Sequence, residues 1–163
     1  MIKQFIPQEI CLECRGCCRF NQRDSVWSPA LLNEEAQELL RNKIPPLFIS
    51  TDKKILLGQL AGEGNFACSF LRPEENLCKI YPRRPFECQL YPFLINRKGA
   101  KVFLALDLHC PFAAKKIKTR DFKGYVLYLT EFLNSPPQAE ILKNNPQIIQ
   151  VYPEALGLGE LKI

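Results

Sequence analysis

Apolar residues at helical spacing predict three helices. The clearest run follows Thr119, where apolar residues three and four positions apart would share one face of a helix. They are Phe122, Tyr125, Val126, Leu129, Phe132 and Leu133. A similar pattern after Ser28-Pro29 predicts a helix over about residues 29–42, because serine caps a helix and proline suits its first turn. Ser135-Pro136 predicts a third, shorter helix that ends near Asn144.

Short apolar runs bounded by glycine predict strands elsewhere. Two of them, residues 47–49 and 55–57, precede a glycine-rich stretch. Residues 91–95 and 101–106 predict a hairpin, since a short polar segment with glycine separates them. Short strands together with helices indicate the α+β class. We expect a small, irregular α+β domain with short antiparallel strands and two to four packing helices.

The length of 163 residues suits one domain, since a chain of this size buries about 70% of its unfolded surface. No linker or low-complexity segment divides the sequence. We expect a cysteine-bearing core over about residues 11–112 and a helical part over about 119–163. Residues 147–163 have no clear period and are predicted to be a packed extension.

Eight cysteines carry the candidate chemistry. Four lie close together near the start of the chain, and four are spread along its middle. Thiolates are soft ligands that occur in fours around zinc and iron–sulfur clusters, so one or two metal centres are expected. The predicted ligands are Cys11, Cys14, Cys17, Cys18, Cys68, Cys78, Cys88 and Cys110. Two-residue gaps between the first three allow one turn to offer several sulfur atoms to one ion or cluster.

A short repeat surrounds two of these cysteines. Cys78 and Cys88 are each followed three positions later by tyrosine and four positions later by proline. Arg84 lies between the two copies, beside Pro85. A guanidinium near thiolates stabilises their charged form and donates hydrogen bonds, so Arg84 is predicted to support a bound metal or cluster without ligating it. His109, the only histidine, is more simply an ordinary side chain than a ligand, because eight thiols already complete two four-ligand shells.

Charge and compartment narrow the function classes. The formal net charge of +5 counts every cysteine as neutral. With all eight deprotonated around two dipositive ions it would fall to roughly +1, so it does not indicate nucleic-acid binding. The basic run from Lys115 to Lys123 is interpreted as a solvated helix face. The sequence shows no signal peptide and no membrane-spanning run, so we expect a cytoplasmic protein whose thiols stay reduced rather than forming disulfides.

The spacing of the cysteines does not identify which metal is bound. It differs from the bacterial ferredoxin run, which has three residues between its third and fourth cysteines, and no paired histidines mark a simple zinc finger. An all-thiolate set favours iron–sulfur narrowly, in one or two four-iron clusters, while zinc would use the same eight ligands equally well.

With these motifs assembled, the chain resembles the YkgJ-like family of zinc- or iron-chelating cysteine-cluster proteins. The resemblance rests on the opening cysteines Cys11 to Cys18, on Cys68-Ser69-Phe70-Leu71, on the block Cys78 to Cys88 with Arg84-Pro85, and on Cys110-Pro111. It covers about residues 11–112 and implies a metal- or iron–sulfur-binding domain. Many relatives have a glycine-containing turn where this chain has residues 72–76, which we interpret as loop variation.

Three function classes follow. The leading one is a cytosolic metal-binding protein for electron transfer or metal handling. The second is a metal-dependent enzyme for redox chemistry or group transfer such as protein methylation, although no catalytic motif beyond the cysteines supports it. The third is a zinc-scaffolded module for binding nucleic acid or protein, supported only by the basic run.

Overall fold

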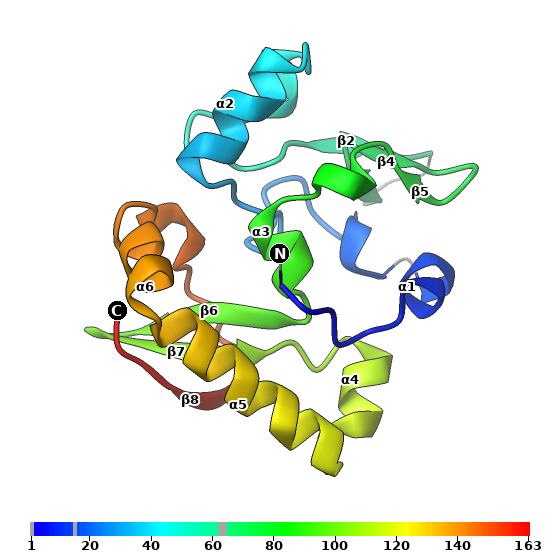
Figure 1. Cartoon of the computed structure of the whole chain (residues 1–163). Coiled ribbons are helices and arrows are strands. Elements are labelled where there is room, and N and C mark those ends of the chain that lie inside the picture. Colours follow the sequence, from blue (N-terminus) through cyan, green and yellow to red (C-terminus); the bar gives the residue numbers. More distant parts are fainter. Residues whose placement is uncertain (1, 15, 62–64) are drawn as a thin grey trace. The chain divides into compact units, whose positions relative to one another are not determined.

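The computed structural model describes residues 2–14, 16–61 and 65–163. The chain forms two compact units (Figure 1). The cysteine unit comprises Gln8–Gln89, and the C-terminal unit comprises Met1–Pro7 with Leu90–Ile163. The interpretation of residues 1–163 as one domain stays a prediction.

The cysteine unit is built from short elements joined by turns. Antiparallel pairing gives a three-stranded sheet in the order β1-β3-β2 and a separate hairpin of β4 and β5. The elements are α1 (Gln8–Cys14), η1 (Gly16–Cys18), β1 (Arg19–Phe20), α2 (Asn33–Arg41), η2 (Pro46–Phe48), β2 (Leu57–Gln59), β3 (Phe66–Cys68), β4 (Leu71–Arg72), β5 (Leu77–Cys78), η3 (Tyr81–Arg83) and α3 (Phe86–Leu90), whose last residue already belongs to the C-terminal unit.

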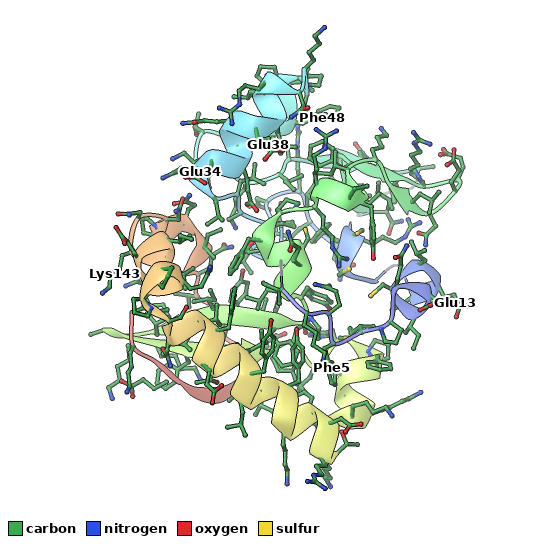
Figure 2. All side chains as sticks on the ribbon, viewed as in Figure 1. Phe5, Glu13, Glu34, Glu38, Phe48 and Lys143 are labelled. Carbon is green, nitrogen blue, oxygen red and sulfur yellow. The ribbon has the colours of Figure 1, made fainter. Side chains whose placement is uncertain are left out.

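One hydrophobic core holds these elements together. The helix α2 contributes Ala36 and Leu39, while its Glu34 and Glu38 are exposed on the opposite side (Figure 2). Cys68 belongs to the same core, so at least one candidate ligand lies within the apolar interior. The core residues are Phe20, Leu31, Ala36, Leu39, Ile55, Leu57, Ala67, Cys68, Phe70 and Leu71.

The helix expected over residues 29–42 begins later, at Asn33. Ala30 forms an antiparallel bridge with Lys54, which keeps the preceding segment extended. The helix starts where the Glu35 carboxylate accepts a hydrogen bond from the Leu32 amide at 2.9 Å. Pairing with a distant part of the sequence thus overrides the serine–proline start signal, whereas the predicted end at Asn42 is confirmed.

The two strands expected over 47–49 and 55–57 are largely wrong in extent. Residues 46–48 form the turn η2, and β2 begins only at Leu57. A single antiparallel bridge joins Ile49 and Ile55. Pro45 and Pro46 explain the difference, because proline fixes the backbone and favours the start of a turn over a paired strand.

The C-terminal unit is a three-stranded antiparallel sheet with helices. The strands, in the order β6-β7-β8, are β6 (Phe93–Lys98), β7 (Lys101–Leu106) and β8 (Leu156–Leu161). The helical segments are α4 (Pro111–Lys116), α5 (Arg120–Asn134), α6 (Pro136–Lys143) and η4 (Pro146–Ile148). The predicted hairpin is confirmed, and its turn uses Gly99 at a positive φ of 61°. The helices predicted after Thr119 and Ser135 are confirmed as α5 and α6, and the Thr119 hydroxyl caps α5 by accepting from the Phe122 amide at 3.2 Å.

An aromatic cluster fills the C-terminal unit. Phe5, labelled in Figure 2, lies within 5.0 to 5.8 Å, centroid to centroid, of the rings of Phe93, Phe112, Phe122 and Tyr125. The Tyr125 hydroxyl also donates to the carbonyl of Lys3. Residues 2–7 therefore belong to the same unit as residues 90–163, although more than eighty residues separate the two segments in the sequence.

The predicted α+β class with short antiparallel strands is confirmed. The described residues contain six α-helices, more than the two to four expected, because α1, α3 and α4 are helices of only five to seven residues. None of the helices in the described ranges is long and apolar enough to span a membrane.

Glu35 provides a test of this account of the cysteine unit. Its carboxylate accepts from the amides of Leu32 at 2.9 Å and Phe86 at 2.7 Å, and burial raises its pKa. Glu35→Ala would leave both partly buried amides without their acceptor, so we expect the free energy of unfolding to fall by about 1–3 kcal/mol. Urea denaturation followed by Trp27, the only tryptophan, measures this change because Trp27 packs against the core.

The matched control is Gln37→Ala, which removes an exposed side chain from the same helix. It should change the free energy of unfolding by less than about 0.5 kcal/mol. Equal stabilities of the two variants would contradict the assigned role of Glu35.

Candidate metal centre

Seven of the eight cysteines lie in the cysteine unit, on five short elements. Cys11 and Cys14 lie in α1, and Cys17 and Cys18 lie in η1. Cys68 and Cys78 end the strands β3 and β5, and Cys88 lies in α3. Cys110 belongs to the C-terminal unit, directly before α4. All eight are free thiols.

Strand pairing brings distant parts of the sequence to the same place. Arg19 of β1 pairs with Ala67 of β3, so Cys18 just before β1 lies at the strand end where Cys68 is found. Cys78 pairs with Leu71 across the β4–β5 hairpin. Both Cys18 and Cys78 pack against the core that contains Cys68. The fold therefore gathers cysteines that are fifty to sixty residues apart in the sequence.

Four thiols interact electrostatically: Cys17, Cys68, Cys78 and Cys88. Burial, with smaller contributions from the neighbouring Cys78 and Cys17, raises the pKa of Cys68 to about 11. Burial also raises the pKa of Cys88 well above its ordinary value, with added contributions from the other three thiols and from Glu87. Each of these thiolates would thus be costly to form alone and costlier beside the others.

The pKa of Cys17 is raised mainly by a cause other than burial, unlike the pKa values of the other three thiols. A hydrogen bond with the side chain of Cys18 is the largest contribution that raises its pKa, followed by burial. The adjacent cysteines therefore interact with each other, although their side chains start from consecutive residues. This pair links Cys18 to the group of four.

Arg84 is the cation of this region. Its positive charge lowers the pKa of Cys17 and of Cys78, against the larger effects that raise both. The guanidinium lies 4.5 Å from the centroid of the Tyr81 ring, a cation–π contact that fixes its position. Arg83 instead donates to the side-chain oxygen of Asn42 at 2.6 Å. The two neighbouring arginines thus make different contacts, and the supporting role of Arg84 at a metal site stays a prediction.

The donor chemistry fits a thiolate-bound metal. Buried thiols that raise one another's pKa are the groups whose deprotonation a metal cation would most favour. In the described ranges, no three His, Cys, Asp or Glu side chains are arranged closely enough to hold a metal ion. The fold thus gathers the donors without setting a coordination geometry, and the assignment of all eight cysteines as ligands stays a prediction.

Asn76 shapes the turn between Cys68 and Cys78. Its φ is 56°, a left-handed conformation that glycine adopts easily and asparagine tolerates. Its side-chain amide donates to the carbonyl of Leu12 in α1. The Asn76 Oδ1 atom is buried and, within the described residues, has no hydrogen-bond partner. Asn76 thus adopts the left-handed conformation of this turn and ties the β4–β5 hairpin to the helix that carries Cys11 and Cys14.

His109, in the C-terminal unit, has an acidic partner that the sequence analysis did not identify. Its Nδ1 atom lies 2.9 Å from Oδ1 of Asp107, a buried carboxylate that also accepts from the Tyr91 hydroxyl at 2.9 Å. A carboxylate that holds one ring nitrogen is a common partner of metal-binding histidines. The spacing Asp107-Leu108-His109 was the available signal, although the same contact also suits an ordinary turn.

Comparison with known proteins gives a family but no individual relative. Neither the curated proteins nor the solved structures include a match to the chain. Residues 10–118, about two thirds of the sequence, match the CxxCxxCC family, which is described as "Putative zinc- or iron-chelating domain". This range includes all eight cysteines and Arg84. The chain belongs to this family of cysteine-cluster domains.

Proposed function

We propose that this protein binds an iron–sulfur cluster through cysteine thiolates in the cytosol and serves electron transfer or metal handling. The observation that carries the proposal is the mutual electrostatic interaction of Cys17, Cys68, Cys78 and Cys88, which come from four separate elements. Cys18 joins them through Cys17. Neutral thiols can lie this close together without a metal, but as thiolates they require a cation that neutralises their charge.

The donors favour iron–sulfur over other metals. The cysteine unit contains no histidine, because His109 lies in the C-terminal unit, so the nearby soft donors are all sulfur. Such a cluster would supply a site for one-electron transfer, and its potential depends on nearby charges and hydrogen bonds. Arg84 would then set part of that electrostatic environment. Four thiolates also suit zinc, and this outcome is distinguished below.

The metal content tests the proposal directly. The full chain, purified without oxygen, is expected to contain iron with an equal amount of acid-labile sulfide and to absorb near about 400 nm. Elemental analysis, a sulfide assay and the visible spectrum are measured on the same sample. Stoichiometric zinc in a colourless sample would refute the cluster and leave a zinc centre. Neither metal, after reconstitution with iron and sulfide or with zinc, would refute metal binding.

Cys88→Ser tests the ligand assignment within the group of four. Serine keeps the size of the side chain but is a poor ligand for iron and zinc, so we expect the metal content to fall to half or less. Leu77→Ser is the control, because it introduces the same side chain at a half-exposed site beside Cys78. Its metal content should match that of the unaltered protein. Full metal content in Cys88→Ser would show that Cys88 is not a ligand.

Arg84→Ala tests the supporting role of the cation. Loss of a group that supports ligands from outside the coordination shell costs about 10-fold to 100-fold in metal affinity. We therefore expect a correspondingly lower concentration of chelator to remove half of the metal. Arg83→Ala is the control, since Arg83 contacts Asn42 instead. The same chelator sensitivity in both variants would contradict a special role for Arg84.

A further inference from the structure

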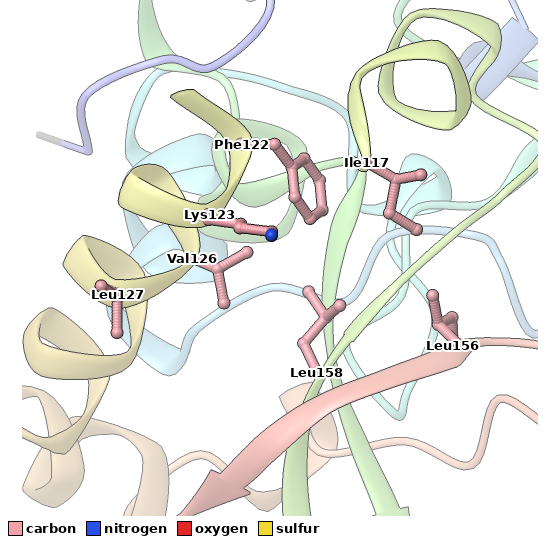
Figure 3. Close-up of a pocket in the computed structure, with 7 residues that line it drawn as sticks. All are labelled: Ile117, Phe122, Lys123, Val126, Leu127, Leu156 and Leu158. Carbon is pink, nitrogen blue, oxygen red and sulfur yellow. The ribbon is translucent and has the colours of Figure 1, made fainter. Parts of the chain in front are cut away.

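An apolar groove lies in the C-terminal unit between α5 and β8 (Figure 3). Its volume is about 360 Å³. Six of its side chains are apolar: Ile117, Phe122, Val126, Leu127, Leu156 and Leu158. The seventh is Lys123, which extends from α5 into the same space (Figure 3). The groove thus combines a wide apolar surface with one positive charge.

The rim of the groove is too exposed for a small molecule. Leu127 is 64% exposed and Leu156 is 39% exposed, so two of the largest lining side chains face solvent. Small-molecule pockets bury most of their ligand. Exposed leucines beside a shallow groove are more typical of a protein interaction site, which an additional chain would cover.

The strand β8 adds hydrogen-bonding capacity to this surface. It is the last strand in the order β6-β7-β8 and, within the described residues, pairs only with β7. Its other edge presents backbone donors and acceptors, which an extended peptide can pair with as an added strand. Leu156 and Leu158 of β8 line the groove, so a peptide on this edge would reach the apolar surface.

The positive charge around the groove favours a peptide with acidic side chains. Lys123 lines the groove, and Lys116 and Lys118 flank the lining residue Ile117. Arg120 begins α5 nearby. These four cations are exposed, and in the described part of the chain none of them forms an ion pair. Acidic side chains on a partner would complement them, whereas a second copy of this chain would bring the same positive charge to the contact.

We propose that the groove binds an extended segment of a partner protein that combines apolar side chains with neighbouring aspartate or glutamate. The apolar side chains occupy the space between α5 and β8, and the acidic ones face Lys123 and the adjacent cations. Six of the seven lining residues lie beyond residue 118, where the family match ends. The partner would therefore be specific to this protein rather than common to the family.

Selection from a random library of displayed 12-residue peptides tests the proposal on the full chain. We expect the enriched peptides to share acidic and apolar residues. Lys123→Glu and Leu127→Ser should each weaken their binding by about tenfold or more, measured by fluorescence anisotropy of one labelled enriched peptide. Affinity should also fall between 50 and 300 mM salt, because the acidic contacts are screened.

Leu47→Ser is the matched control, since Leu47 is 69% exposed but lies in the cysteine unit. It should bind the peptide as tightly as the unaltered protein. Thermal unfolding and metal content measured on each variant show whether folding or metal binding has changed, so failure of this proposal is distinct from failure of the metal assignment.

Other outcomes would overturn the proposal. These are no enriched peptide, enriched peptides without acidic residues, or equal binding to Leu127→Ser. Binding of vesicles containing phosphatidylglycerol or of a 20-nucleotide DNA, with no peptide enriched, would assign the surface to a membrane or to nucleic acid. A dimer that Leu127→Ser dissociates would assign it to a second copy of this chain.

Discussion

The proximity of several thiols, with Cys68 buried among them, is the constraint on which the cysteine unit depends. A single buried thiol is a small apolar side chain and costs little. Cys68 and Cys88, however, have neighbours that raise their pKa in addition to the effect of burial. Without a metal they are stable as neutral thiols, and as thiolates they require a compensating positive charge. The same arrangement is therefore stable without a metal and binds a cation strongly once the thiols are deprotonated.

The backbone around these thiols is positioned by acidic and amide side chains rather than by long elements. Glu35 accepts from the first amide of α3, the helix that carries Cys88, and Glu87 of that helix accepts from the Ala30 amide at 2.6 Å. Asn76 connects the β4–β5 hairpin to α1. The two glutamates accept from backbone amides and Asn76 donates to a backbone carbonyl, groups that short helices leave without partners. Short elements can then be held in place without the extensive packing that longer ones provide.

The sequence predicted the elements whose signals are local. The periodic residues of α5, its threonine cap and the β6–β7 hairpin required nothing from the rest of the chain. The start of α2 was wrong because the bridge between Ala30 and Lys54 depends on a segment twenty residues away. The strand β8 was missed, since its glycines at 157 and 159 lower strand propensity and pairing with β7 decides its conformation. The candidate ligands could be named from spacing, but the interaction among four of them could not, because it depends on strand register and burial.

Arg84 shows how one position can reconcile the two requirements of such a site. The apolar interior favours neutral thiols, while metal binding requires anionic ones. A cation within reach of Cys17 and Cys78 reduces the cost of deprotonation without itself being a ligand. The contact with the Tyr81 ring holds the guanidinium of Arg84 in place. A lysine would not make the same contact, because its ammonium group is not planar and its stem is more flexible. Because Tyr81 follows Cys78 by three residues, the repeated cysteine–tyrosine spacing has a physical reason in its first copy. In the second copy the equivalent Tyr91 donates to Asp107 instead, so the same spacing supports a different contact.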